Sequence, residues 1–223
     1  FQGHSDCEVL IPMYERYGIE MCKRLDAEFA FILTDEVNHR IIAARDPIGI
    51  RPLFYGLQKK TRKIAFASEA KALVDLCSEV HPFPIGCVYD GGRFISYNDI
   101  TKTKAKTLTD ETEIKTAIRE KLTLGVQKRM MSDVPVGYLL SGGLDSSLVC
   151  AIAARSSDKP LTTFAIGMTT DAIDLKYAKQ VADHLHSDHH EITMTVDDVL
   201  KALPEVVRML ETYDITTIRA SLG

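Results

Sequence analysis

The chain has 223 residues, of which 45% are hydrophobic and 26% are charged, so it can bury one large core or two modest ones. Its formal net charge is −4 and no run of basic residues could neutralise a row of phosphates, so we expect no nucleic-acid partner. No apolar run approaches membrane-spanning length and no signal peptide is recognised, so we expect no membrane partner either.

The first predicted helix begins at Ser5, which has capping-box spacing to Glu8, and runs towards Gly18 with a kink at Pro12. Short apolar runs separated by turn residues follow, and they predict strands. The short spacings between these runs indicate hairpins and hence an antiparallel sheet. The predicted strands cover residues 29–33, 41–44, 53–55 and 64–67, and a short helix is expected over residues 68–76.

A polar region at residues 88–109 separates the two halves of the chain. It contains a turn at Asp90-Gly91-Gly92 and then an extended, solvated stretch. We place a linker at residues 101–112, between domains at residues 1–100 and 113–223. Asp110 with Glu113 caps the next helix, in which Gly125 costs about 1 kcal/mol relative to alanine. The apolar positions of this helix recur at four-residue steps: Ile114, Ile118, Leu122, Val126 and Met130.

Strands and helices alternate in the rest of the chain, which predicts βαβ units and a parallel sheet. Ligands of such sheets bind at the carboxyl ends of the strands. We expect the last helix to restart at Pro204, because the first turn of a helix does not need the missing N–H of proline. The other expected elements are strands at residues 136–140, 161–166 and 190–194 and helices at residues 146–155 and 174–185.

The five cysteines are scattered, and none belongs to a Cys-x-x-Cys pair. We therefore expect reduced thiols in a cytoplasmic protein rather than a disulfide framework or a zinc site. The neighbouring His189 and His190 invite a metal-site interpretation. Adjacent residues of a strand point to opposite faces, however, so these two side chains cannot easily share an ion.

The run from Val136 to Ser147, VGYLLSGGLDSS, joins a buried strand, a glycine turn and a helix start. Two adjacent glycines let successive N–H groups turn towards one anion, and the following helix adds its positive N-terminal end. This pattern predicts a nucleotide phosphate site. No lysine follows the glycines, and Gly-x-Gly-x-x-Gly is absent, so the loop is not the one that phosphoryl-transfer enzymes use.

At these residues the sequence resembles the pyrophosphate loop of the N-type ATP pyrophosphatases, and LLSGGLDSS is similar to the loop of glutamine-dependent asparagine synthetases. Three further blocks resemble the same family. Two of them belong to its glutaminase half and are shared with related amidotransferases, whereas the third belongs to its synthetase half. These blocks are RDPIGIRPL at residues 45–53, FASEAKAL at residues 66–73 and ETYDITTIRAS at residues 211–221.

The resemblance implies an α+β and α/β chain: part of an N-terminal-nucleophile glutaminase sandwich, a glutamine amidotransferase type 2 domain, followed by part of a doubly wound parallel-sheet ATP pyrophosphatase domain. It also implies a ligase that uses aspartate, glutamine, ATP and Mg²⁺ to make asparagine. In that scheme the aspartate side chain attacks the α-phosphorus of ATP, which gives β-aspartyl-AMP and pyrophosphate. Ammonia from glutamine then releases AMP and asparagine.

The same resemblance implies which residues bind ATP. The serines and glycines would hold the leaving pyrophosphate, while Leu140 and Ile166 would border the adenosine. Asp145 is assigned to Mg²⁺, because a carboxylate beside phosphates would otherwise repel them; the alternative is a helix cap. The full ATP-binding set is Leu140, Ser141, Gly142, Gly143, Leu144, Asp145, Ser146, Ser147, Ile166 and Gly167.

Thr216 and Arg219 are the residues to which the resemblance assigns the aspartate substrate. The planar guanidinium of an arginine matches a carboxylate, which suits this role. A surface ion pair of Arg219 is the alternative.

The glutaminase nucleophile of this family is an N-terminal cysteine, which the chain does not contain, so we expect no glutaminase activity from these residues alone. Asp6 matches the aspartate that holds the α-ammonium of glutamine, whereas Cys7 does not match the nucleophile. Leu25-Asp26-Ala27 departs from the usual Leu-Asp-Gly, which puts the local backbone in doubt. Three further residues are assigned to structure and domain contact: Arg45, Arg51 and Glu69.

Two other functions stay open at this point. One is a related amidotransferase-type synthetase, such as a β-lactam synthetase, and the other is a non-catalytic nucleotide-binding protein. From its first and last residues we also expect the chain to be an internal piece of a longer enzyme. A homodimer is compatible with the resemblance.

Overall fold

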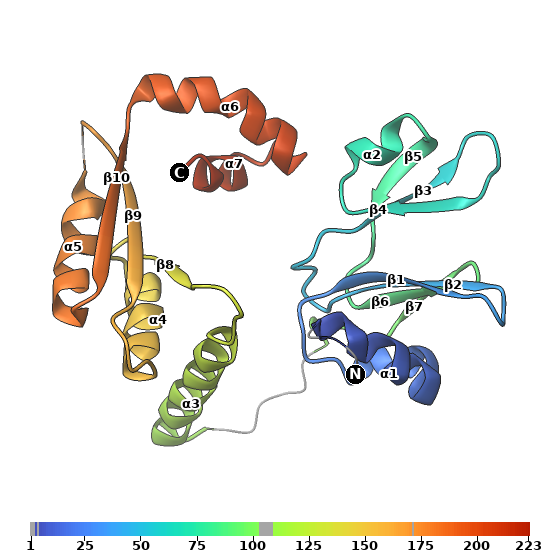
Figure 1. The fold of residues 1–223 in the computed structure, drawn as a ribbon, viewed down its shortest axis with the longest axis horizontal. Coiled ribbons are helices and arrows are strands. Elements are labelled where there is room, and N and C mark those ends of the chain that lie inside the picture. Colours follow the sequence, from blue (N-terminus) through green and yellow to red (C-terminus); the bar gives the residue numbers. More distant parts are fainter. Residues whose placement is uncertain (1–2, 4, 103–108, 171) are drawn as a thin grey trace. The chain divides into compact units, whose positions relative to one another are not determined.

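A computed structural model describes residues 3, 5–102, 109–170 and 172–223 (Figure 1). The chain divides into two compact units, Phe1–Ala105 and Lys106–Gly223. The expected linker at residues 101–112 falls partly outside the described residues, so the proposed domain boundaries stay a prediction. Among the described residues, no helix is both long and apolar enough to cross a membrane.

The N-terminal segment is three short pieces rather than one helix. A 3₁₀ turn η1 (Asp6–Val9) precedes α1 (Leu10–Tyr17) and a second 3₁₀ segment η2 (Gly18–Lys23). The Ser5 hydroxyl accepts a hydrogen bond from the N–H of Cys7. The N–H of Glu8 donates to the Ser5 carbonyl instead, so the Ser5 side chain does not cap Glu8 as expected. Pro12 lies in the first turn of α1, where its missing N–H is not needed.

A four-stranded antiparallel sheet of the first unit has the order β1-β2-β6-β7. Its members are β1 (Ala30–Asp35), β2 (Arg40–Arg45), β6 (Cys87–Asp90) and β7 (Arg93–Ser96). The sequence predicted the first two and the turn at Asp90-Gly91-Gly92, but not the strands on either side of that turn. Gly91 and Gly92 both have positive φ, as a two-residue hairpin turn requires.

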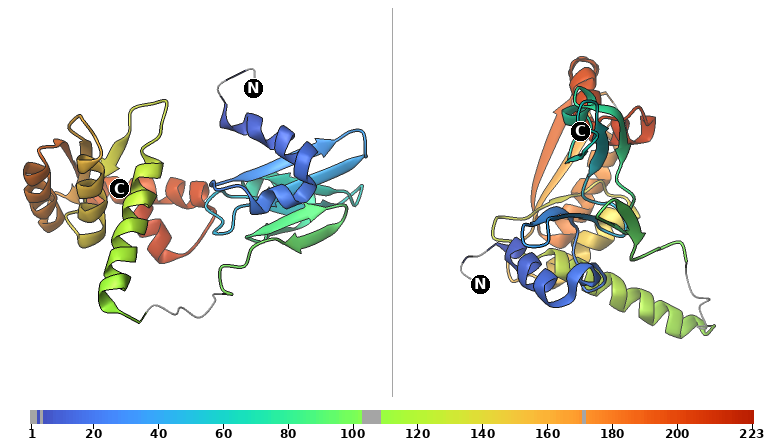
Figure 2. Two further views of the ribbon diagram at one scale, coloured as in Figure 1. Left: turned by 90° about the horizontal axis from the view of Figure 1, so that it is seen from below. Right: turned by 90° about the vertical axis from the view of Figure 1, so that its right-hand side faces the viewer.

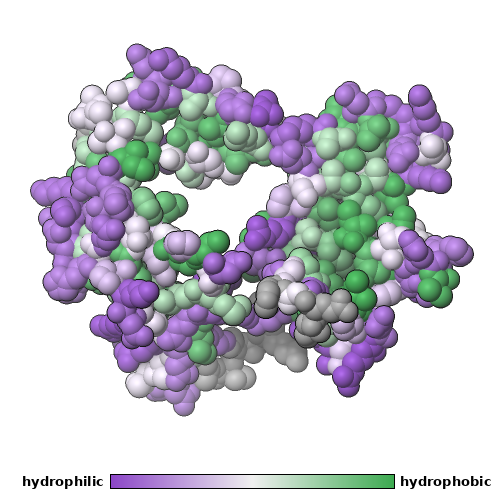
Figure 3. Space-filling model, in the orientation of Figure 1, coloured by the Kyte–Doolittle hydropathy of each residue, from purple (hydrophilic) through white to green (hydrophobic). Residues whose placement is uncertain are grey.

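A second antiparallel sheet has the order β4-β3-β5. It contains β3 (Phe54–Gln58), β4 (Ile64–Ala67) and β5 (Cys77–Pro82), with the short helix α2 (Lys71–Val74) before β5. The expected antiparallel pairing is confirmed, and the described strands of this unit form two separate sheets. Aromatic rings join the sheets: Phe94 of β7 lies 4.8 Å from Tyr55 and 5.2 Å from Phe83 between ring centroids. Hydrophobic residues also spread over the visible face of this unit (Figure 3).

Asp46 begins the tight connection between the two sheets and is 1% exposed. Its carboxylate accepts hydrogen bonds of 2.6–3.1 Å from four successive backbone N–H groups, those of Ile48, Gly49, Ile50 and Arg51. Burial acts to raise the pKa of this carboxyl, but the four N–H donors outweigh it and the pKa is lowered. We call this segment, residues 46–51, the Asp46 turn.

Arg45 holds the same connection from the other side. Its guanidinium donates to the carbonyl oxygens of Arg51, Phe83 and Gly49 at 2.8, 3.0 and 2.8 Å. The carbonyl of Arg45 in turn accepts from the Tyr97 hydroxyl at 2.7 Å. Arg45 was expected to serve structure and domain contact, and these hydrogen bonds account for its structural role.

The second unit has a parallel sheet with the order β10-β9-β8. The long helix α3 (Glu111–Arg129) precedes it, with Asp110 accepting from the N–H of Glu113 as predicted. The βαβ units then follow in the predicted order: β8 (Gly137–Leu139), α4 (Leu144–Arg155), β9 (Thr162–Met168), α5 (Ile173–Leu185) and β10 (Asp188–Met194).

The crossover helices α4 and α5 contact each other, so both lie on one face of this sheet (Figure 2). A doubly wound sheet has crossover helices on both faces, and that part of the expected architecture is not seen in the described residues. The described residues thus form a mixed α/β structure with two antiparallel sheets and one parallel sheet.

The helix predicted to restart at Pro204 begins earlier, and that prediction is wrong. Helix α6 (Val196–Leu210) starts with a capping box between Thr195 and Asp198, and Pro204 lies inside it. The last helix is α7 (Ile215–Ser221). No residue of α6 is buried, and four apolar side chains form an exposed stripe along it: Val196, Leu200, Leu203 and Val207.

Candidate functional site

The pyrophosphate-loop candidate, Ser141-Gly142-Gly143, leaves the carboxyl end of β8 directly into α4. The N–H of Leu140 still donates to the carbonyl of Phe164 at 2.8 Å, so the sheet extends to the edge of the loop. The Ser146 hydroxyl lies 3.0 Å from that of Ser141 and accepts from the Ser141 N–H at 3.2 Å. The two serines therefore close the loop over the start of the helix.

Gly142 is the residue that fixes the shape of this loop. Its φ is +76°, in the region that favours glycine. A Cβ at this position would lie 2.5 Å from the backbone nitrogen of Ala178 and 2.6 Å from the carbonyl carbon of Tyr177. Helix α5 therefore packs directly against Gly142 and leaves no room for a side chain there. The sequence did not predict this contact, because the residues involved are far apart in the chain and no local pattern marks them.

The N-terminus of α4 is open for an anion. Its N-cap is Gly143, and no side chain caps the N–H groups of the first turn. The hydroxyl of Ser147, in the same turn, is buried and has no hydrogen-bond partner among the described residues. Free N–H groups, two further hydroxyls and the helix dipole are the usual means of binding a phosphate.

Asp145 is the second residue of α4, and its side chain is exposed. Because Gly143 occupies the N-cap and no side chain caps this helix, the alternative role of Asp145 as a helix cap is wrong. Among the described residues no group of three or more acidic, histidine or cysteine side chains could hold a metal by itself. One exposed carboxylate beside the predicted phosphate site has the chemistry that Mg²⁺ requires, since this ion commonly binds through one or two carboxylates and the phosphates of a substrate.

The two residues expected to border adenosine lie near the carboxyl ends of the neighbouring strands β8 and β9. Leu140 follows β8 and is 1% exposed, whereas Ile166 is half-buried in β9. A Cβ on Gly223 would lie 2.8 Å from Cγ2 of Ile166, so the end of α7 reaches this edge. A Cβ on Gly167 would lie 2.8 Å from Leu175, which means that α5 needs a small residue there.

Helix α7 carries the two residues assigned to aspartate. Asp214 caps this helix through the N–H and hydroxyl of Thr217, both at 2.7 Å, and is not free for a ligand. Thr216 and Arg219 lie three residues apart and so share one side of α7. Within the described part of the chain Arg219 has no ion-pair partner, which leaves the surface-pair alternative without support.

Asp6 lies in the first unit as the exposed first residue of η1. A groove of about 960 Å³ runs nearby between α1 and β1, but Asp6 is not among its lining residues. The structure does not bring this side chain together with another predicted site residue, and its role stays a prediction.

Comparisons with known proteins agree with this arrangement. The family described as "Glutamine amidotransferase domain" matches residues 1–86, and the family described as "Asparagine synthase" matches residues 117–222. The chain therefore contains sequence of a glutamine amidotransferase domain followed by part of an asparagine synthase domain. Curated relatives extend the match over nearly the whole chain, and the chain belongs to the family of glutamine-hydrolysing asparagine synthetases.

Three relatives illustrate the similarity. A probable asparagine synthetase [glutamine-hydrolyzing] of Dictyostelium discoideum is 41% identical over 99% of this chain, and asparagine synthetase 1 of Saccharomyces cerevisiae is 41% identical over 97% of it. Asparagine synthetase B of Escherichia coli is 39% identical over 99% of it. The chain spans only 42–44% of the length of these relatives.

Proposed function

We propose that this chain is part of an enzyme that makes asparagine from aspartate, ATP and glutamine-derived ammonia, with release of AMP and pyrophosphate. The observation that carries the proposal is the open loop Ser141-Gly142-Gly143 at the N-terminus of α4, without a lysine. Such a loop suits the binding of a pyrophosphate that leaves intact, rather than the transfer of a terminal phosphoryl group.

The chemistry explains why ATP is needed. An amide does not form efficiently from a free carboxylate, because oxide is a very poor leaving group. Attack of the aspartate side chain forms a bond between a carboxylate oxygen and the α-phosphorus. The bond from that phosphorus to the oxygen of the β-phosphate breaks, pyrophosphate leaves with its electron pair, and β-aspartyl-AMP results. Ammonia then adds to the activated carbonyl and AMP leaves with the electron pair of the broken bond.

Each part of the site has a role in this scheme. The loop N–H groups, Ser146 and Ser147 would bind the β- and γ-phosphates and stabilise the charge that develops on pyrophosphate. Arg219 would bind a carboxylate of aspartate through its planar guanidinium, with Thr216 beside it. The proximity of Gly223 to Ile166 supports this arrangement, because it brings the end of α7 to the nucleotide edge of the sheet.

Asp145 would hold Mg²⁺, which supplies charge neutralisation at the phosphates when it is bound. Its exposed carboxylate in the first turn of α4 supports this assignment. In the first unit, Asp6 would hold the α-ammonium of glutamine.

Product analysis of the enzyme that contains this chain tests the proposal. Aspartate, glutamine and [α-³²P]ATP should yield labelled AMP, asparagine and pyrophosphate in equal amounts. Formation of labelled ADP and orthophosphate would contradict cleavage between the α- and β-phosphates. A requirement for a carboxylate other than that of aspartate would favour the related synthetases instead.

A further inference from the structure

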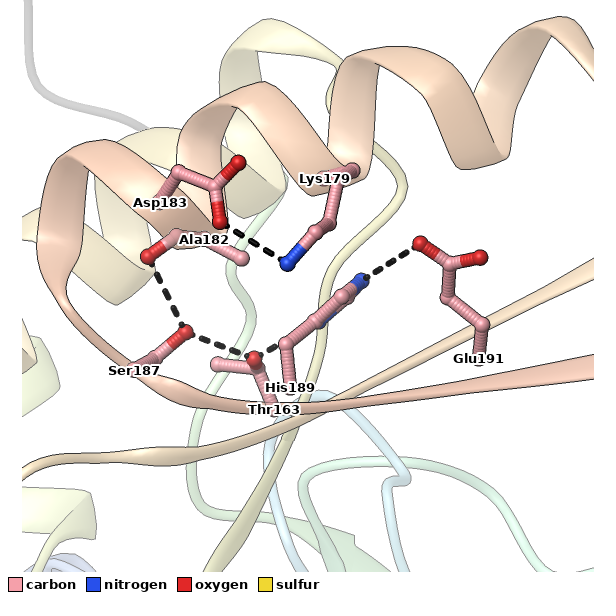
Figure 4. Close-up of polar contacts among 7 residues, drawn as sticks. All are labelled: Thr163, Lys179, Ala182, Asp183, Ser187, His189 and Glu191. Carbon is pink, nitrogen blue, oxygen red and sulfur yellow. Dashed lines mark hydrogen bonds and ion pairs between the residues drawn. The ribbon is translucent and has the colours of Figure 1, made fainter.

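A network of buried hydroxyl groups joins β9, α5 and β10 on the face of the parallel sheet that α5 covers (Figure 4). Its centre is Thr163 of β9, which is fully buried. The Thr163 hydroxyl lies 2.9 Å from the Ser187 hydroxyl and 2.9 Å from Nδ1 of His189. The Ser187 hydroxyl donates to the carbonyl of Ala182, in the last turn of α5, at 3.4 Å. The function proposed above uses none of these residues.

One arrangement of the protons follows from the contact of Ser187 with Ala182, because a carbonyl oxygen only accepts. With the Ser187 proton directed at that carbonyl, the Thr163 hydroxyl donates to Ser187 and accepts from Nδ1 of His189. In this arrangement Thr163 links Ser187, which contacts the last turn of α5, to His189 of β10.

Helix α5 connects this network to the pyrophosphate loop. Ala182 and Ala178 are one turn apart on α5, and both are almost completely buried against the sheet. The backbone nitrogen of Ala178 is the atom that a Cβ on Gly142 would meet at 2.5 Å. The loop has no room to move towards α5, so a shift of α5 along or away from the sheet changes the wall against which the loop is formed.

We propose that Thr163 is a positioning residue for the pyrophosphate loop. It acts through Ser187 and the last turn of α5, and it touches neither ATP nor the loop itself. In the strand register Thr163 lies opposite Tyr138, three residues before Ser141, which is about 10 Å along the strand. This role rests on the proposed binding of ATP by the loop.

The test compares Thr163→Val, which keeps the shape but removes the hydroxyl, with Thr163→Ser, which keeps the hydroxyl. In the enzyme that contains this chain, Thr163→Val should raise the Kd for Mg·ATP by roughly tenfold, the loss expected for one network hydrogen bond. Thr163→Ser should restore binding to within about twofold. Ser187→Ala removes the hydroxyl that joins Thr163 to the Ala182 carbonyl, while the Ser187 N–H still donates to that carbonyl at 3.1 Å, and it should weaken binding in the same direction.

Two further measurements separate positioning from general loss of stability. ¹⁵N NMR of His189 should show a proton on Nδ1 in wild type and Thr163→Ser, and its loss from Nδ1 in Thr163→Val, while Nε2 faces Glu191 at 3.8 Å in all three. Val126→Ala is the matched control, because it removes buried methyl groups from the same core on α3. It should lower stability without faster amide exchange at Gly142 and Gly143, whereas Thr163→Val should accelerate that exchange.

Unchanged ATP affinity and unchanged exchange at the two glycines in Thr163→Val would overturn the proposal. The proposal would also be overturned if Val126→Ala and Thr163→Val had the same stability and lost the same amount of ATP affinity. If Thr163→Val does not fold, Thr163→Ser and Ser187→Ala still decide, since only Ser187→Ala should weaken binding. A wild-type protein that binds no ATP would refute the proposed function, while glycine exchange and the His189 tautomer would still test the role of Thr163.

Discussion

Replacement of Gly142 by alanine should damage the loop far more than replacement of its neighbour Gly143. Gly142 has a φ of +76°, and its missing Cβ would lie 2.5–2.6 Å from atoms of Tyr177 and Ala178. Two of the nearest three atoms belong to the backbone of a helix and cannot rotate away. Gly143 has a φ of −71°, and the nearest atom to its missing Cβ is Oγ of Ser141 at 3.4 Å.

The magnitude follows from two separate costs. A left-handed backbone conformation costs an alanine about 1–2 kcal/mol. Forcing an extra carbon into a packed region costs about 1–3 kcal/mol more. Gly142→Ala should therefore lower the free energy of unfolding of the second unit by about 2–5 kcal/mol. Gly143→Ala changes only an N-cap residue and should cost less than about 1 kcal/mol.

Urea unfolding followed by circular dichroism measures these differences, and calorimetric titration with Mg·ATP measures the effect on the site. We expect Gly142→Ala to lose ATP binding even under conditions where it stays folded, and Gly143→Ala to keep most of it. Equal stabilities of the two variants would refute the argument from φ and from the wall formed by α5.

Asp145→Ala in the full enzyme should abolish ATP–pyrophosphate exchange while glutamine hydrolysis continues; exchange with unchanged Mg²⁺ dependence would remove Asp145 from the metal site. Asp46→Asn should cost about 1–3 kcal/mol at pH 7, because a carboxylate that accepts four N–H bonds is replaced by a weaker acceptor. The pKa of Asp46 is lowered from 3.8, so its stabilising effect is present above that pH and is lost as the pH falls through the folded-state value. The stabilities of wild type and Asp46→Asn should therefore converge in acid, and a constant difference between pH 7 and pH 3 would contradict this assignment. Burial raises the pKa of Cys22 to about 11, whereas Cys7 is exposed, so iodoacetamide at pH 7.5 should label Cys7 first in a mass-spectrometric time course. Labelling of both thiols at one rate would show that the first unit opens readily.

The second unit was the more predictable part of the fold from sequence. Hydrophobic runs, caps and glycine turns gave β8, α4, β9, α5 and β10 in the right order, with ends that differ by only a few residues. The first unit was less predictable, because β5 (CSEVHP) and β7 (RFIS) contain no run of three apolar residues, and β6 and β7 have only four residues each. Local patterns also do not tell which hairpins share a sheet, so they did not assign the individual strands to the two sheets.

The candidate site shows the same limit. The loop and the helix start were found because their residues are adjacent in sequence. The contact of Gly142 with Ala178 and the network around Thr163 join residues more than twenty positions apart, and no local pattern marks them. Pro204 misled the prediction of α6 because proline often begins a helix, whereas here Thr195 and Asp198 provide a stronger start.

The Asp46 turn has a consequence for the order in which the first unit folds. The four N–H groups that donate to the Asp46 carboxylate all lie within five residues of it. These hydrogen bonds therefore close very small loops, and closing them costs little chain entropy. Contacts of this kind form early on the folding timescale, before strands that are far apart in sequence can pair. The turn can therefore orient β2 and β3 in the nascent chain before β5 and β6 arrive to complete their separate sheets.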